Sequence, residues 1–357
     1  MNSAPVAGHS QPAGVLTDCL LVQAEPRDLE TVVALADRDG GGLVMTGKNA
    51  VEACGSARQR GFSRPLLADR RRYAGNARVP GTAPLTKSWL DAQTAAGTAA
   101  VLADSGYVGR GDEAALESVL DQAAAEDAGV VAVLPLHASW LETGRKKLLS
   151  EVNAHAVPVA LVLEHVKDPL ASRAAVRGLV EFLRQSQVPV SLLSTDVSGI
   201  GALAFGARWS AVGVRPALRH LYPVREGGWN QFPQVSALIR PLLSVVSVQR
   251  IAEAWARTCT SQEWTQDVWT CYCPTCRGRT ADWMATASEA EVNAHTFEIL
   301  GELRDGVSAL PPGRIRERSW TSKCNMAVSR YDELRLDLRI GWEAPGYLRS
   351  WAALWHR

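Results

Sequence analysis

The sequence predicts an α/β protein, a (β/α)8 barrel of the TIM type followed by a smaller C-terminal subdomain. Three observations lead to this fold class: eight short apolar runs, amphipathic segments of helical period between them, and a cysteine cluster close behind the last run. Alternation of this kind is typical of βαβ units around a parallel sheet. Because the runs are apolar at nearly every position, we expect strands that are buried on both faces.

The repeating elements can be assigned in order along the chain. The predicted strands are Cys19–Gln23, Leu43–Thr46, Pro65–Ala68, Ala100–Ala103, Val130–Leu136, Val157–Leu163, Val190–Ser194 and Trp209–Val214. The predicted helices are Asp28–Asp37, Asn49–Gln59, Glu113–Glu126, Ser139–Ala154, Pro169–Gln185, Gly199–Phe205 and, as the eighth barrel helix, Ser236–Arg257. An open doubly wound sheet is the competing architecture. No glycine-rich nucleotide-binding motif follows the first strand, and this favours the barrel.

The cysteine cluster predicts a metal site. Cys271, Cys273 and Cys276 form a C-x-C-x2-C pattern, and His295 follows Cys276 by nineteen residues. Three thiolates and one imidazole complete a tetrahedral shell around Zn²⁺ and leave no position open for water, so we expect a structural zinc. Cys259 is the alternative fourth ligand. Cys19, Cys54 and Cys324 are expected to be buried thiols.

Composition sets the limits for the rest of the chain. The 357 residues carry a net charge of +1, so no overall positive field announces a nucleic-acid partner. We find no signal peptide and no membrane-length apolar run, and we expect a cytoplasmic protein. Nine of the twelve tryptophans lie from Trp229 onward, which indicates a second unit. The predicted organisation is a disordered tail over 1–14, the barrel over 15–257, the zinc subdomain and its helix over 258–310, and an extension over 311–357.

Polar side chains follow the predicted strands, where the functional groups of a barrel are placed. These candidates are Asp104, Ser105, Gly106 and Tyr107 after the fourth strand, His137 after the fifth, Glu164 and His165 after the sixth, Asp196 after the seventh, and Arg215 after the eighth. Asp168 and Asp196 could also serve as helix caps. As a set, these residues predict a polar pocket at one end of the barrel.

The cysteine–histidine pattern and the segment Asp104-Ser105-Gly106 together resemble the tRNA-guanine transglycosylases and their DNA-acting 7-deazaguanine relatives. That resemblance covers roughly residues 60 to 305. It implies a zinc-bearing barrel that exchanges a purine or 7-deazapurine base in tRNA or DNA, as in queuosine formation, and that often pairs with a second chain. Asp104 would contact the base, with Ser105 and Gly106 close to it. An aspartate on the last strand would attack the sugar carbon and form a covalent intermediate.

The chain departs from that family in several places, and one of them is the spacing from Cys276 to His295, which is shorter than the usual one. Tyr107 stands where the family has a second glycine, and the eighth predicted strand, Trp209–Val214, has no carboxylate. One hypothesis is therefore a divergent transglycosylase in which Asp196 is the nucleophile or base, assisted by His137 and Glu164. A second is a non-catalytic relative that binds nucleic acid or a nucleoside. A third is a barrel enzyme with unrelated small-molecule chemistry.

Local patches of arginine are the candidate contacts for nucleic acid. Guanidinium groups near aromatic side chains suit phosphate contact and stacking, and the candidates are Arg70, Arg71, Arg72, Arg219, Arg277 and Arg279. The C-terminal extension predicts a half-buried strand over Tyr331–Ile340, where charged and aliphatic residues alternate. A short helix with an aromatic face, bearing Tyr347, Trp351 and Trp355, is expected to follow and to pack on the rest of the protein.

Overall fold

The eight predicted strands form one parallel sheet. The computed structural model describes residues 16–126, 129–224, 234–258, 263–337 and 341–355. Its first eight strands are β1 (Cys19–Ala24), β2 (Leu43–Thr46), β3 (Leu66–Asp69), β4 (Val101–Leu102), β5 (Val130–His137), β6 (Val159–Glu164), β7 (Val190–Thr195) and β8 (Trp209–Gly213). Each lies within one or two residues of the run that predicts it. The predicted barrel is confirmed.

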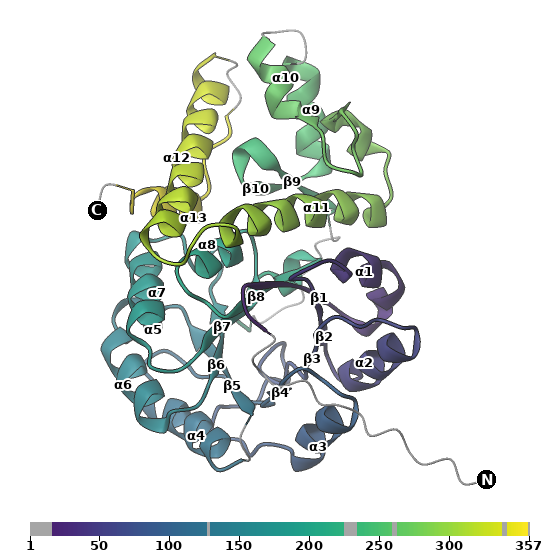
Figure 1. Cartoon of the computed structure of the whole chain (residues 1–357). Coiled ribbons are helices and arrows are strands. Elements are labelled where there is room, and N and C mark those ends of the chain that lie inside the picture. Colours follow the sequence, from purple (N-terminus) through teal and green to yellow (C-terminus); the bar gives the residue numbers. More distant parts are fainter. Residues whose placement is uncertain (1–15, 127–128, 225–233, 259–262, 338–340, 356–357) are drawn as a thin grey trace, which may run out of the picture.

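The order of the strands closes the sheet into a barrel. It runs β3-β2-β1-β8-β7-β6-β5-β4, with β1 paired to β8 in parallel from Cys19 opposite Trp209 to Gln23 opposite Gly213. Between β3 and the start of β4, the Ala99 amide donates to the Leu66 carbonyl at 2.8 Å. Figure 1 shows the resulting ring of strands with the helices outside it. Every strand end of the same polarity therefore opens on the same mouth.

Two apolar cores follow from the alternation of side chains along these strands. Leu21, Val44, Val133 and Trp209 fill the inside of the barrel. The opposite faces pack against the helices in a second core that extends into the C-terminal units. Tyr73, on the loop after β3, also belongs to the inner core, so part of the barrel mouth is filled by the protein itself.

Helices α1 to α8 surround the sheet. They are α1 (Leu29–Ala36), α2 (Ala50–Gln59), α3 (Lys87–Ala95), α4 (Glu113–Ala124), α5 (Ser139–Glu142), α6 (Arg145–His155), α7 (Arg173–Gln185) and α8 (Ser198–Ala204), with the 3-10 turns η2 (Pro26–Asp28) and η3 (Pro216–Leu218). The single helix predicted over 139–154 is two, because the chain bends at Gly144, where a Cβ would lie 2.7 Å from the Trp140 ring. Helix α7 is capped by Ser172, whose hydroxyl accepts from the Ala175 amide, and not by Asp168.

The helix predicted over Ser236–Arg257 is wrong in its first half. Residues Ser236–Ile239 (β9) and Ser244–Ser247 (β10) pair as an antiparallel hairpin around η4 (Arg240–Leu242), and only Val248–Thr258 (α9) is helical. Pro241 lacks an amide hydrogen, and the β-branched Val245 and Val246 favour a strand. Burial alternates along β10, as in a strand with one buried face, and this pattern does not fit a helix.

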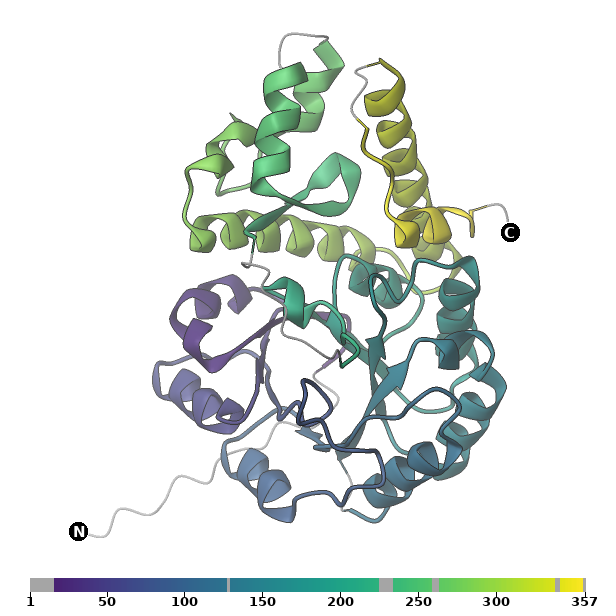
Figure 2. The same cartoon turned by 180° about the vertical axis from the view of Figure 1, so that it is seen from behind.

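The place of the eighth barrel helix is taken by α11 (Glu289–Ser308). This helix packs on α8, α1 and β1 on one side and on β9 on the other. Between β9 and α11 the chain forms α10 (Glu263–Trp269), the short strands β11 (Thr270–Cys271) and β12 (Arg279–Thr280), and η5 (Ala281–Ala285). Both views show α11 lying beside the barrel, beneath the green unit that contains β9, β10, α9 and α10 (Figure 1, Figure 2).

The C-terminal extension is helical. The strand predicted from Tyr331 is wrong, because α12 runs over Arg314–Asp337 and buries Tyr331 and Leu334 at helical spacing while Leu336 is exposed. Residues 338–340 of that prediction lie outside the described residues. The final helix is confirmed as α13 (Gly346–Ala352), with Tyr347 and Trp351 buried. None of the helices in the described part of the chain is both long and apolar enough to cross a bilayer.

Candidate functional site

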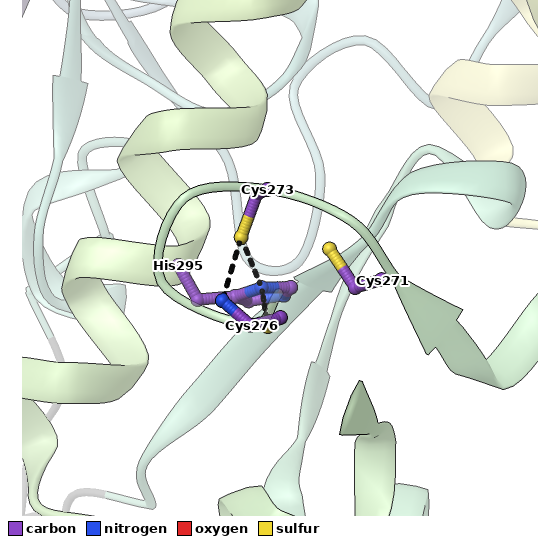
Figure 3. A group of neighbouring side chains, drawn as sticks. All are labelled: Cys271, Cys273, Cys276 and His295. Atoms are coloured by element: carbon purple, nitrogen blue, oxygen red, sulfur yellow. Dashed lines mark hydrogen bonds between the residues drawn. The ribbon is translucent and has the colours of Figure 1, made fainter. Parts of the chain in front are cut away.

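Four side chains meet beside α11 as a metal-binding group. Cys271 ends β11, Cys273 and Cys276 lie in the turn that follows, and His295 projects from α11 (Figure 3). Their sulfur and nitrogen atoms all lie within 4.8 Å of one another. The His295 Nδ1 is 3.1 Å from the Cys276 sulfur and 3.6 Å from the Cys273 sulfur. The four predicted ligands thus converge as a metal shell would require.

The surroundings of His295 fit its role as a ligand. Its Nε2 lies 2.9 Å from the carbonyl oxygen of Leu238 in β9, so Nε2 carries the proton and donates it there. The Nδ1 lone pair is then left for a metal, and a partner of this type fixes both tautomer and ring orientation. Hydrogen bonding from Cys276 and the nearby His295 lower the pKa of the Cys271 thiol to about 4. The residues present fit a bound metal ion.

The other cysteines do not join this group. Cys19, Cys54 and Cys324 are buried, as expected, and burial raises the pKa of Cys54 to about 12. A thiol of that kind is protonated and inert at neutral pH. Cys259, the alternative ligand, lies outside the described residues.

At the barrel mouth, the Asp104 carboxylate is engaged by protein groups on both oxygens. Its Oδ2 accepts from Arg70 at 2.7 Å and from Arg72 at 2.9 Å, and its Oδ1 accepts from the Thr86 amide at 3.0 Å. The carboxylate side chain is fully buried, while those of Arg70 and Arg72 are 32% and 20% exposed. Arg70 and Arg72, which were predicted to contact phosphate, therefore pair with Asp104, which was predicted to contact the base. The Arg71 side chain instead donates to the Ala217 carbonyl at 2.6 Å.

The segment after Asp104 shows why a glycine stands there. Ser105 is buried, and a Cβ on Gly106 would lie 1.9 Å from the Pro80 carbonyl oxygen, so no other residue fits this approach. Tyr107 comes next, with its amide donating to Val79 at 2.8 Å. The loops after β3 and β4 are thereby joined over the mouth.

Tyr107 belongs to a compact polar group that the sequence only partly indicated. The guanidinium of Arg78 lies 3.8 Å from the centre of the Tyr107 ring, and its Nη1 is 2.8 Å from Glu164 Oε1. The Tyr107 hydroxyl donates to the other oxygen of Glu164. Glu164 ends β6, and its side chain is 2% exposed. Arg78 was not predicted, because its partner Glu164 lies 86 positions away in the sequence and no local pattern relates the two residues.

Two histidines lie at neighbouring strand ends. Nδ1 of His137 accepts from the Ser139 amide at 3.1 Å, and Nδ1 of His165 accepts from the Asp168 amide at 3.0 Å. Each ring therefore keeps its proton on Nε2 when neutral. Burial lowers the pKa of His137, and the charges of Arg110 and His165 lower it further.

A buried network inside the mouth was not among the predicted site residues. Tyr73 donates to Asp69 Oδ2 at 2.6 Å, and burial raises the pKa of Asp69. Gln23, at the end of β1, donates to Thr46 at 2.9 Å and accepts from the Ser194 amide at 2.7 Å. Asp69 ends β3, so its position at a strand end was the available signal.

Asp196, the other predicted catalytic carboxylate, faces a different group. Its Oδ1 accepts from the Ser198 amide at 2.8 Å, and burial raises its pKa. Asp168 lies close enough that repulsion from Asp196, after burial, raises the pKa of Asp168 to about 6. Both line a cavity of about 20 Å³ together with Leu161, Leu163 and Leu192, which belong to the core outside the barrel.

The remaining arginine candidates bind protein groups. Arg215 Nη2 lies 2.5 Å from Asp28, and Arg219 donates from Nε to the Gly213 carbonyl at 3.2 Å. Arg277 donates to the Pro274 carbonyl at 3.1 Å, and Arg279 donates from Nη2 to the Thr275 carbonyl at 2.9 Å. The last two hold the turn that carries the cysteines.

Comparison with known proteins assigns no family to this chain. No family model matches the chain, and no curated protein does. Among solved structures, a mutant tryptophan synthase α-subunit from Pyrococcus furiosus is 18% identical, with 55% of this chain and 87% of that chain covered and a TM-score of 0.37. A type I 3-dehydroquinate dehydratase from Clostridium difficile is 12% identical, with 58% of this chain and 88% of that chain covered and a TM-score of 0.37. A thiamine phosphate pyrophosphorylase from Pyrococcus furiosus is 16% identical, with 56% of this chain and 88% of that chain covered and a TM-score of 0.32. The barrel itself is established by its strand order.

Proposed function

We propose that this chain is a zinc-stabilised barrel that recognises a purine or 7-deazapurine base in nucleic acid, as a divergent relative of the tRNA-guanine transglycosylases. The observation that carries the proposal is the joining of two features. A Cys3His group is anchored on the helix that completes the barrel, and the segment Asp104-Ser105-Gly106 lies at the mouth of that barrel. Both features belong to the resemblance, and they come from distant parts of the chain.

Zinc is the metal that this donor set favours. Thiolate and imidazole ligands in a closed group of four are typical of structural Zn²⁺, and such a shell has no position for a reacting water. When bound, the ion would hold the turn after β11 against α11. Cys271, Cys273, Cys276 and His295 would be its ligands.

The group around Tyr107 suits the recognition of a planar, polar ligand. An aromatic ring with a guanidinium above it offers stacking, and Glu164, which accepts from both Arg78 and Tyr107, holds the pair in place. Arg70 and Arg72, each partly exposed, supply positive charge beside it.

Recognition without base exchange is the form of the proposal that the geometry favours. Strand β8 runs Trp209-Ser210-Ala211-Val212-Gly213, so it offers no carboxylate to a sugar carbon. A second candidate is exchange with Asp196 as nucleophile. The nearby Asp168, with its pKa raised to about 6, would hold the proton that a leaving base must take up.

A combined binding and exchange assay tests the proposal. The metal-loaded protein would be incubated with labelled guanine or 7-deazaguanines and either bulk tRNA or duplex DNA, and binding of each nucleic acid would be measured by fluorescence anisotropy. We expect binding that Tyr107→Ala weakens about tenfold, with no label incorporated. Incorporation that disappears in Asp196→Ala would establish the second candidate. If the protein neither bound nucleic acid nor incorporated label, the proposal would be overturned. A barrel enzyme with unrelated small-molecule chemistry would then be the remaining hypothesis.

A further inference from the structure

We propose that the turn bearing the cysteines is a second nucleic-acid contact, which takes one unpaired base of a single strand into the cavity beside it. This turn, residues 271–279, will be termed the knuckle. The proposal goes beyond base recognition at the barrel mouth, because it concerns a different unit of the protein and a base that is not exchanged.

The knuckle presents an aromatic side chain to solvent. Tyr272 lies between two metal-binding cysteines and is 82% exposed, whereas Cys273 and Cys276 are fully buried. Gly278 has a φ of +87°, and a Cβ at that position would lie 3.4 Å from Cε1 of the tyrosine ring. The backbone therefore supports one side of the ring, and the ring is held outward as part of the turn. A supported, exposed aromatic ring is the usual platform for a nucleic-acid base.

A cavity of about 190 Å³ lies against this tyrosine. Its walls are mostly apolar and include Leu238, Trp269 and Met284 as well as Tyr272 itself. The metal-binding residues Cys271 and His295 form part of the wall, so an inserted base would lie next to the metal group. A cavity of about 150 Å³ with such walls accepts benzene in another protein. A single base ring therefore fits here, with Tyr272 at the entrance. Asp267 also lines the cavity and could accept a hydrogen bond from the exocyclic amino group of adenine.

The charge of the knuckle favours nucleic acid over a protein partner. Residues 271–279 include Arg277 and Arg279 and no acidic residue, and both arginines are exposed. The Arg279 guanidinium lies 4.2 Å from the centre of the Trp283 ring and donates to Thr275, so it is held at the surface in a fixed position. Phosphates on either side of an inserted base would meet these two cations.

The test uses fluorescein-labelled dA12 and rA12 with the metal-loaded full chain, and the dA12–dT12 duplex for comparison. We expect the single strands to bind more tightly than the duplex, whose bases are already stacked. Tyr272→Ala should weaken dA12 binding about tenfold, and Tyr272→Phe should stay within about twofold, since base–aromatic stacking does not need the hydroxyl. Arg277→Gln should lower the slope of binding against salt by about one. Ratios for dA12 and rA12 separate DNA from RNA as the partner.

Met326→Ala is the matched control, because Met326 is 66% exposed on α12 and lies outside the knuckle. It should bind like the wild type. Metal content measured for each variant shows whether the knuckle is intact. Equal binding by Tyr272→Ala and the wild type, with metal retained, would overturn the inference. Tyr107→Ala tests the barrel mouth separately, so either site can fail alone.

Discussion

At the scale of single residues, the spacing of cysteines and histidine in the sequence predicted the metal-binding group, but no sequence pattern predicted the ion pairs at the barrel mouth. The Cys3His group was predictable because three closely spaced cysteines and a following histidine match the usual ligand set of a structural zinc. The pairing of Asp104 with Arg70 and Arg72 was not, since it depends on how two loops after different strands meet. The same holds for Arg78 with Glu164. Residue types at strand ends marked the mouth, and only the fold decided which of them are already engaged.

Substituting Asp104 tests how much that engagement stabilises the mouth. In Asp104→Asn, the amide NH2 must face a donor in either orientation, because two guanidinium groups donate to one carboxylate oxygen and the Thr86 amide donates to the other. We expect the free energy of unfolding, measured in urea, to fall by about 2 kcal/mol. Asp91→Asn, at a side chain that is 64% exposed, is the control and should change it by less than about 0.5 kcal/mol. An equally small change in Asp104→Asn would contradict this prediction, because it would mean that water replaces the carboxylate as a partner of both arginines at no cost.

Asp168 gives the protein a stability that depends on pH. Its pKa is raised to about 6 in the folded state, from an ordinary value of 3.8. Folding therefore favours its protonated form, and this contribution is fully present below about pH 4 and is lost as the pH rises through 6. In Asp168→Asn, the fall in unfolding free energy between pH 4.5 and 7.5 should be smaller than in the wild type by roughly 2 kcal/mol. Equal slopes in urea titrations of both proteins would contradict this.

At the scale of elements, burial on both faces made the strands easy to predict and left the C-terminal helices ambiguous. All eight barrel strands are short apolar runs, and the sheet imposes that composition. Helix α3 (Lys87–Ala95) was missed because its exposed face is polar and its apolar positions are few. The segment of the β9–β10 hairpin was predicted to be helical, and the end of helix α12 was predicted to be a strand. Their neighbours, α11 and α13, decide which of their faces are buried.

Helix α11 links the metal group to the barrel, so loss of a ligand should be felt in both. Cys273→Ser removes one thiolate from a shell of four, and we expect most of the metal to be lost, as measured by elemental analysis. The melting temperature should fall by at least about 3 °C, which corresponds to roughly 2 kcal/mol for a protein of this size. Cys324→Ser is the matched control: this buried thiol lies on α12, so the variant should melt lower and keep its metal. Full metal retention in Cys273→Ser would remove Cys273 from the shell.

At the scale of the whole molecule, one apolar core runs through the barrel helices, the metal-bearing unit and the C-terminal extension. Helix α13 is where they meet. The Tyr347 amide donates to Asp168 at 3.0 Å, the Tyr347 hydroxyl donates to Leu243 beside the β9–β10 hairpin at 2.8 Å, and Ser350 donates to Ala171 at 2.8 Å. A helix that binds the barrel and the hairpin at once makes their unfolding cooperative.

Trp351 is the residue on which this cooperativity depends. It is fully buried, with its ring centre 5.4 Å from that of Phe205 and 6.3 Å from that of Trp320, and its ring would lie 2.8 Å from a Cβ on Gly201. Trp351→Ala should cost about 3–5 kcal/mol of unfolding free energy because it opens a cavity between α8, α12 and α13. Calorimetry should show one transition in the wild type and one at lower temperature in the variant, with the metal still bound at room temperature. If the variant showed two transitions, and only one of them had moved, the barrel and the C-terminal units would be separate folding units that merely touch through α13.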